Sequence, residues 1–296
     1  MDFRSIGMGL AFAFMWSSAF TSARMIVVDA PPFTALSIRF LVSGLIAIII
    51  AKAVGQTWHL PKAQWRSVVV FGLCQNALYL GLNFVAMQWV EASLASIIAS
   101  TMPLIVALLG WLFYKQRLPA LGLAGLAAGV VGVAIIMGSR FSGHVSPEGL
   151  VLCGLGALAL AIATLTVRAA TSGGNLLMIV GLQMLVGSAL LAVAALLTET
   201  WHVNWTLRLG LAFAYTTLIP GLLATWVWFR LVARIGAVRA ATYHFLNPFF
   251  GVTVAAVLLH ERLGLTDIIG VVIIGAGILA VQLSRQSASQ APVKAA

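Results

Sequence analysis

The chain has 296 residues, of which 61% are hydrophobic and 8% charged, and its net charge is +10 with a mean hydropathy of +1.06. This composition excludes a soluble globular protein, because too little polar surface is available to cover it, and it indicates an integral membrane protein. The Lys and Arg residues stand singly between apolar runs, which argues against nucleic-acid binding. The first expected partner is therefore the lipid bilayer.

Ten apolar runs are long enough to cross about 30 Å of hydrocarbon as helices. They cover approximately residues 5–27, 33–54, 67–90, 92–114, 119–138, 148–167, 176–198, 208–230, 237–259 and 265–283. The first run has no convincing small-residue cleavage site, so we expect it to be retained as a span. The sequence predicts an all-α membrane protein with short connections, followed by a disordered cytoplasmic tail over 285–296.

The distribution of basic residues predicts the orientation of these spans. Ten spans place both termini on one side, and the segments on that side carry twelve of the seventeen Lys and Arg residues: Arg4, Lys52, Lys62, Arg66, Lys115, Arg117, Arg168, Arg230, Arg234, Arg239, Arg285 and Lys294. Basic residues concentrate in cytoplasmic segments. We therefore expect cytoplasmic termini in a multi-pass protein of a bacterial inner (plasma) membrane.

The second half of the chain repeats the first. An offset of 145 places Pro103 on Pro248, Arg117 on Arg262 and Gly125 on Gly270, and an offset of 144 over the earlier part places Arg39 on Gln183. Five spans in each half is an odd number, so the second half enters the membrane from the other side. The sequence predicts two inverted repeats, over 1–143 and 144–284, an organisation common in membrane transporters.

Several motifs resemble the drug/metabolite transporter superfamily and, within it, the EamA type. They are the stretch from Phe14 to Phe20 in span 1, Arg39-Phe40 in span 2, and a proline-centred span with a short turn, seen as Pro103 to Leu118 and Pro248 to Leu263. The resemblance covers essentially the whole chain before the tail, and the pattern is most similar to the YddG-like branch. It implies export of amino acids, aromatic ones in particular. The family's Glu-Arg-Leu ending is kept at Glu261, but Gln116 stands at the first copy.

The proline-bearing spans contain the first group of candidate residues. Pro103 and Pro248 cannot donate a backbone hydrogen bond, so each predicts a bend that is either fixed or serves as a hinge. Tyr243, His244 and Asn247 precede the second bend, and the last two share one helical face. Polar residues near the membrane middle avoid lipid, so they either line a cavity or form a hydrogen bond between helices.

Two other spans add candidates. Asn76, Tyr79 and Asn83 form one polar stripe on span 3, which either lines a cavity or holds helices together. In span 1, Trp16 lies too deep for an interfacial anchor, and Ser17 follows it. Span 8 offers further aromatic side chains, which are Tyr215, Trp226 and Trp228. Aromatic rings in a pocket would stack with a flat, apolar solute.

Arg39 lies about 9 Å along span 2, where it either extends to the membrane interface or makes a charge contact with a substrate carboxylate or an acidic loop residue. No Asp or Glu lies in the middle of a predicted span, so a carboxylate proton relay has no obvious position. His244 has no intramembrane acid beside it, which argues against an enzyme. Cys74 and Cys153 lie inside apolar runs, and neither a metal nor a cofactor is expected.

These features favour a secondary transporter that works by alternating access. We expect it to export amino acids, aromatic and other apolar ones foremost, and related small metabolites down the substrate gradient. The alternative is an exporter of other neutral metabolites or drugs that couples to protons through His244. A channel is disfavoured because charge rings and carbonyl filters are missing from the sequence. The oligomeric state stays open, with a monomer as one possibility.

Overall fold

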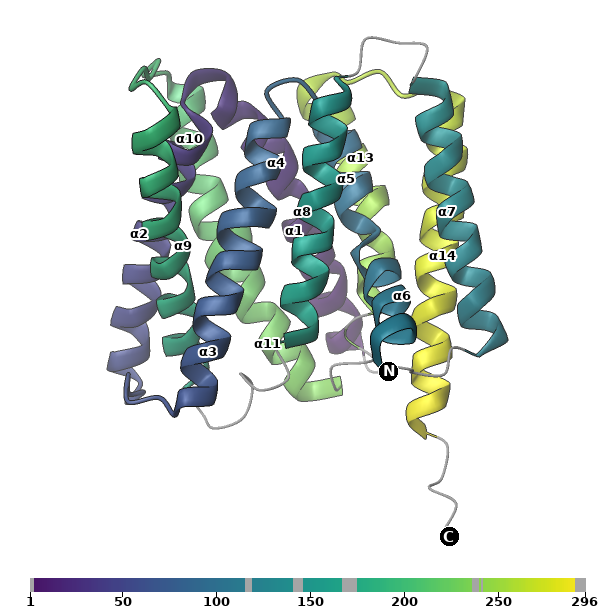
Figure 1. The fold of residues 1–296 in the computed structure, drawn as a ribbon, viewed down its shortest axis with the longest axis horizontal. Coiled ribbons are helices and arrows are strands. Elements are labelled where there is room, and N and C mark those ends of the chain that lie inside the picture. Colours follow the sequence, from purple (N-terminus) through teal and green to yellow (C-terminus); the bar gives the residue numbers. More distant parts are fainter. Residues whose placement is uncertain are drawn as a thin grey trace, which may run out of the picture.

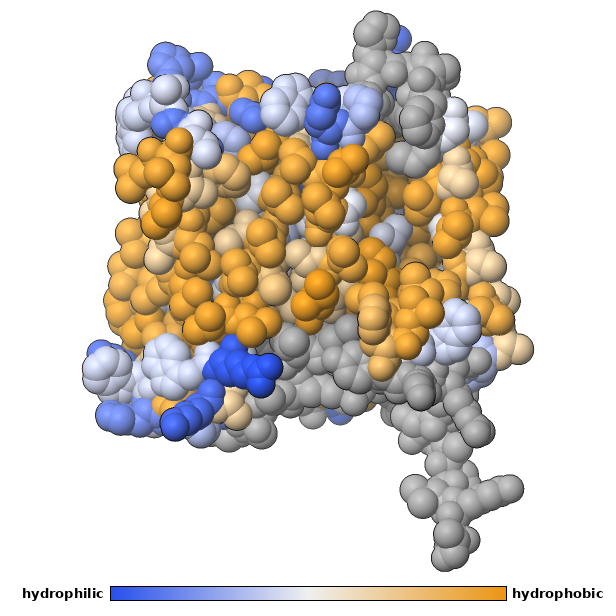
Figure 2. Space-filling model, in the orientation of Figure 1, coloured by the Kyte–Doolittle hydropathy of each residue, from blue (hydrophilic) through white to orange (hydrophobic). Residues whose placement is uncertain are grey.

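The structure is a computed structural model that describes residues 3–114, 119–140, 146–166, 175–235, 240 and 242–290. The secondary structure assigned in these ranges is helical. The helices stand side by side in one bundle, and α1 begins on the face from which α14 ends (Figure 1). We call this the terminal face and the other the opposite face. A broad apolar belt lies between them on the side shown in Figure 2, as expected for a chain surrounded by lipid.

The elements of the first half follow the predicted spans. They are α1 (Phe3–Asp29), α2 (Pro32–Ala53), α3 (Lys62–Phe71), the π-helix η1 (Gly72–Leu80), α4 (Gly81–Ala86), α5 (Ala92–Ser100), α6 (Met102–Tyr114) and α7 (Ala120–Arg140). The elements α3, η1 and α4 are continuous and form one span. This agreement arises because hydropathy alone determines which segments must be buried in hydrocarbon.

The second half contains α8 (Pro147–Thr166), α9 (Leu176–Thr198), α10 (Leu207–Thr216), the π-helix η3 (Thr217–Leu223), α11 (Ala224–Ile235), the 3-10 helix η4 (Thr242–Leu246), α13 (Asn247–Leu259) and α14 (Leu265–Gln290). α14 continues helically to Gln290, into the range 285–296 that the sequence predicts as a disordered tail, and the disordered tail stays a prediction. A helix that is already packed propagates at low cost through residues such as Gln, Ala and Ser. Residues 291–296 of the tail lie outside the described residues.

Nine helical segments of the described chain are long and apolar enough to cross a membrane. The remaining predicted span, 119–138, corresponds to α7, whose apolar part covers Ala120–Ile136 and is shorter than these nine segments. α7 packs along α14 at one edge of the bundle (Figure 1). A crossing by α7 remains the sequence's prediction.

Both proline-bearing spans are interrupted at the proline, as predicted. α5 ends at Ser100, Thr101 intervenes, and α6 begins before Pro103. In the second half, the 3-10 segment η4 leads into α13, where Pro248 occupies the first turn. A proline that cannot donate to the preceding turn explains each break.

Small residues hold two helix pairs together by reciprocal contacts. In α2 and α9, Ser37 Oγ donates to the Ser188 carbonyl at 2.9 Å, and Ser188 Oγ donates to the Ser37 carbonyl at 2.9 Å. A Cβ on Gly125 of α7 would lie 2.6 Å from the Gly277 carbonyl oxygen of α14, and one on Gly277 would lie 2.6 Å from the Gly125 carbonyl oxygen. Such close backbone approach is typical of membrane helix packing.

Candidate functional site

Four rings gather where α1 meets the second half of the chain. Phe12 of α1 lies 5.8 Å from Trp16, 4.7 Å from Trp228 of α11 and 5.4 Å from His244 of η4, measured between ring centroids. Trp228 and His244 are 5.2 Å apart. Phe12 and Trp16 are four residues apart and therefore share one face of α1. We call these four residues the aromatic cluster; such a group can stack with a flat solute.

His244 and Asn247 form a polar pair at the edge of this cluster. The Asn247 Nδ2 lies 3.0 Å from His244 Nδ1. Because an amide nitrogen only donates, Nδ1 accepts this hydrogen bond in the orientation shown, and Nε2 then carries the proton of the neutral ring. Asn247 Oδ1 is buried without a partner among the described residues. The predicted shared face of the two residues is therefore confirmed, and the buried Oδ1 of Asn247 is left as an unpaired acceptor among the described residues.

Tyr243 and Ser17 lie at close helix contacts. Tyr243 packs against Gly9 of α1 and clusters with Trp228. Ser17 is fully buried near Gly251 of α13, which itself presses against Ser96 of α5. The Oγ atoms of Ser17 and Ser96 have no partner among the described residues. These two hydroxyls sit where α1, α5 and α13 meet, beside the proline-associated breaks.

The stripe of span 3 is buried against the second half of the chain. Asn76 Nδ2 donates to the Gln183 carbonyl of α9 at 2.9 Å, and Asn83 Nδ2 donates to the Tyr79 carbonyl at 2.8 Å. Gly156 of α8 faces Asn83, and a Cβ there would lie 2.6 Å from its Nδ2. This arrangement matches the alternative in which the stripe holds helices together. A role of Asn76, Tyr79 and Asn83 in binding stays a prediction.

The three aromatic candidates of span 8 lie in different surroundings. Tyr215 lies with its hydroxyl 2.7 Å from Ser18 Oγ of α1. Trp226 is 48% exposed on the apolar belt, with the Arg230 guanidinium 5.2 Å from its ring. Trp228 alone of the three joins the aromatic cluster. The sequence did not single out Phe12, although its spacing of four from Trp16 was a usable signal.

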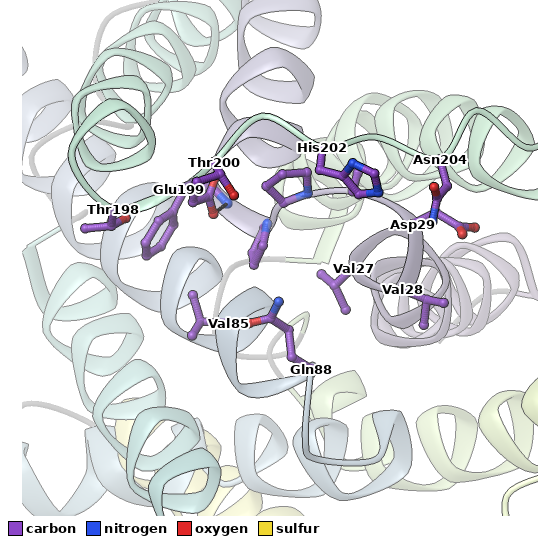
Figure 3. A pocket seen from close by; sticks show the side chains of 14 residues that line it. Val27, Val28, Asp29, Val85, Gln88, Thr198, Glu199, Thr200, His202 and Asn204 are labelled. Atoms are coloured by element: carbon purple, nitrogen blue, oxygen red, sulfur yellow. Dashed lines mark hydrogen bonds between the residues drawn. The ribbon is translucent and has the colours of Figure 1, made fainter.

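A cavity of about 520 Å³ opens on the opposite face. Figure 3 shows its lining side chains converging from the ends of α1 and α9, the start of α2 and the end of α4. Its acidic groups already have partners: Glu199 accepts from Phe33 N at 2.7 Å and Thr34 N at 2.8 Å, and Asp29 accepts from Thr206 Oγ1 at 3.1 Å. The two carboxylates therefore hold the rim of the cavity in place.

Glu261 has a similar capping role on the same face. Its carboxylate oxygens accept from Ala92 N at 2.8 Å and Ser93 N at 3.0 Å, at the first turn of α5. A carboxylate at a helix N-terminus satisfies donors that the helix leaves free and favours the positive end of its dipole. The retained acid of the second repeat thus links α13 to α5. Its counterpart Gln116 lies outside the described residues.

Arg39 does not extend to the membrane interface. It is 5% exposed, and its Nη2 lies 3.6 Å from the position that a Cβ on Gly221 of η3 would take, as does Ser43 Oγ. Ser43 follows Arg39 by one turn, so the two side chains share one face of α2 and both border η3. Among the described residues, no three His, Cys, Asp or Glu side chains are placed to hold a metal ion.

Comparison with known proteins gives consistent matches over the whole length. The EamA-like transporter family matches residues 3–138 and again residues 147–283. The uncharacterised transporter YvbV of Bacillus subtilis is 27% identical over 96% of this chain and 93% of its own. A probable amino-acid metabolite efflux pump of Salmonella typhimurium is 24% identical, with 92% of each chain covered. A crystal structure with 20% identity shares the fold, with a TM-score of 0.70 over 97% of this chain and 99% of that one.

Proposed function

Because this chain belongs to the EamA-like transporter family, we propose that it exports amino acids, aromatic and other apolar ones foremost, with related small metabolites. The observation that carries the proposal is the aromatic cluster with the His244–Asn247 pair at its edge. The rings offer stacking area for an apolar side chain. Asn247 Oδ1, buried without a partner among the described residues, offers an acceptor for an ammonium group.

The site is formed by both halves of the chain. Phe12 and Trp16 come from α1, and Trp228, His244 and Asn247 come from α11, η4 and α13, in that order. Sites at the interface of two repeats are suited to alternating access, because rocking one repeat against the other exposes the site first to one side and then to the other. The two repeats proposed here are 1–143 and 144–284.

The reciprocal helix contacts support an inverted relation between these repeats. The offset of 144 converts the pair Ser37–Ser188 into Gly181–Gly44, and a Cβ on either glycine would lie 3.0 Å from the other's carbonyl oxygen. The offset of 145 likewise converts Gly125–Gly277 into Gly270–Gly132. Pairs that map onto each other are expected around a pseudo-two-fold axis. Such an axis in the membrane plane relates inverted repeats.

The breaks at Pro103 and Pro248 are the proposed hinges. Each lies where a helix is already interrupted, so a change of angle there requires few backbone hydrogen bonds to break. Ser17 packs beside the second break, and we propose that it lines the pathway once the helices separate. Asn76, Tyr79 and Asn83 line it in the same way only if α8 and α9 move away from span 3.

Transport by purified protein in proteoliposomes tests the function. Labelled tryptophan, phenylalanine and methionine are compared with glutamate and a sugar phosphate, each with and without a pH gradient. We expect saturable flux of the three apolar amino acids alone, unchanged by the gradient. Absence of amino acid flux from folded protein would overturn the substrate assignment, while the family membership would stand.

Proton coupling through His244 is the second candidate mechanism, favoured by one observation. Asn247 donates to Nδ1 in the orientation shown, and a flipped amide would present Oδ1 to a protonated ring. The pair can therefore serve either protonation state. If coupling operates, an inward proton gradient will concentrate substrate against its gradient in wild-type protein, and His244→Gln will abolish concentration but keep downhill flux. Concentration that persists in His244→Gln would contradict this mechanism.

A further inference from the structure

Arg39 is a buried cation for which the described part of the chain supplies no counter-ion. Its side chain is 5% exposed, and Nε has no hydrogen-bond partner among the described residues. The contact that the structure gives its guanidinium is the ring of Phe40, with a distance of 5.2 Å from Cζ to the ring centroid. No carboxylate of the described residues pairs with it. A cation in the bilayer region costs several kcal/mol unless an anion or a polar group compensates it.

A second unsatisfied group lies beside this cation. Ser43 is 1% exposed, and its Oγ has no partner among the described residues. Gly221 borders both groups, because a Cβ there would lie 3.6 Å from Arg39 Nη2 and from Ser43 Oγ. The same Cβ would lie 3.1 Å from the Thr216 carbonyl oxygen. The two side chains thus bring several hydrogen-bond donors to one buried position, next to Gly221.

The equivalent position in the other half of the molecule has no such deficit. The offset of 145 places Asn76 on Gly221, and the offset of 144 places Arg39 on Gln183 and Ser43 on Gly187. There, Asn76 packs against Gly187 and donates to the Gln183 carbonyl at 2.9 Å. The interface of η1 with α9 is closed by this internal hydrogen bond. Within the described residues, the interface of η3 with α2 by contrast supplies no hydrogen-bond partner for Arg39 Nε or Ser43 Oγ.

We propose that Arg39 and Ser43 form the subsite for the carboxylate of the exported molecule. This inference rests on the proposed function and narrows its substrate class to amino acids and related monocarboxylates. A guanidinium donates two parallel hydrogen bonds to a carboxylate, and a hydroxyl can add a third. The segment η3 contacts both sites through different residues, since Ile219 packs in one hydrophobic cluster with Phe12 of the aromatic cluster and Gly221 borders Arg39.

Competition for tryptophan uptake in proteoliposomes tests the subsite. Indole-3-propionate keeps the carboxylate and lacks the amine, whereas tryptamine keeps the amine and lacks the carboxylate. We expect indole-3-propionate to compete with wild-type uptake roughly tenfold better than tryptamine, the size of one charge-assisted hydrogen bond. Arg39→Gln should raise the KM for tryptophan by a similar factor and remove the preference, and Arg39→Lys should retain part of it.

Gln183→Ala is the matched control, because it removes the equivalent side chain and keeps the carbonyl that Asn76 uses. An unchanged KM and preference in Arg39→Gln would overturn the proposal. If Arg39→Gln does not fold, equal competition by the two analogues in wild-type protein overturns it instead. Thermal stabilisation of purified protein by indole-3-propionate but not tryptamine, absent in Ser43→Ala, supports the subsite even if transport fails. In that case the carboxylate subsite would stand, and only the proposed export would be contradicted.

Discussion

The aromatic cluster depends on which tryptophan side chains turn inward. Trp226 and Trp228 are two residues apart on α11, so they point to different sides of the helix. Trp226 is 48% exposed on the apolar belt, whereas Trp228 contacts both Phe12 and His244. Composition cannot distinguish the two side chains, but their contacts can, and only Trp228 is placed to touch a solute within the bundle.

This difference gives a prediction with an internal control. Trp228→Leu should raise the KM for tryptophan about two- to tenfold, because one ring contact is worth roughly 0.5–1.5 kcal/mol. Trp226→Leu should leave the KM unchanged, since Leu and Trp both suit an apolar belt. Initial-rate uptake in proteoliposomes measures both variants. Equal effects of the two substitutions would mean that the aromatic cluster is not the binding site.

At the scale of helices, close backbone contact decides where glycine is required. Gly277 of α14 faces the Gly125 carbonyl at the α7–α14 interface, and a Cβ would lie 2.6 Å from that oxygen. A Cβ added to Gly154 of α8, in contrast, would have no neighbouring atom within 4 Å. The two glycines are indistinguishable in an apolar sequence, because both stand in helices of the apolar belt.

Gly277→Ala should therefore lower the stability of the folded protein by about 1–3 kcal/mol, since a helix backbone cannot move aside as a flexible side chain can. Gly154→Ala should be neutral or slightly stabilising, because alanine favours the helix. Thermal unfolding of the purified variants in detergent compares them directly. A Gly277→Ala protein as stable as wild type would show that the α7–α14 interface can separate without cost.

At the scale of the whole molecule, two exposed tryptophans lie near opposite faces. Trp58 is 62% exposed in the connection between α2 and α3, on the terminal face, and Trp205 is 84% exposed in the connection between α9 and α10, on the opposite face. The basic residues predict that the terminal face is cytoplasmic. The structure shows which face each tryptophan lies on, and the distribution of basic residues predicts which face is cytoplasmic.

Cysteine labelling in intact cells tests this orientation. In a background without Cys74 and Cys153, Trp205→Cys should react with a membrane-impermeant maleimide, and Trp58→Cys should react only after the membrane is permeabilised. The two variants control for each other, because both residues are exposed and both lie in connections between helices. Labelling of Trp58→Cys alone in intact cells would reverse the predicted topology.

The sequence by itself determined the spans and their interruptions, because hydropathy and the missing N–H of proline act locally. Pro103 and Pro248 lie at the helix breaks that their positions predicted. Only the tertiary structure decided which polar groups have partners, since those partners come from the other half of the chain. Asn76 reaches the Gln183 carbonyl and Glu261 caps α5, whereas Nε of Arg39, on an equally apolar span, has no hydrogen-bond partner among the described residues.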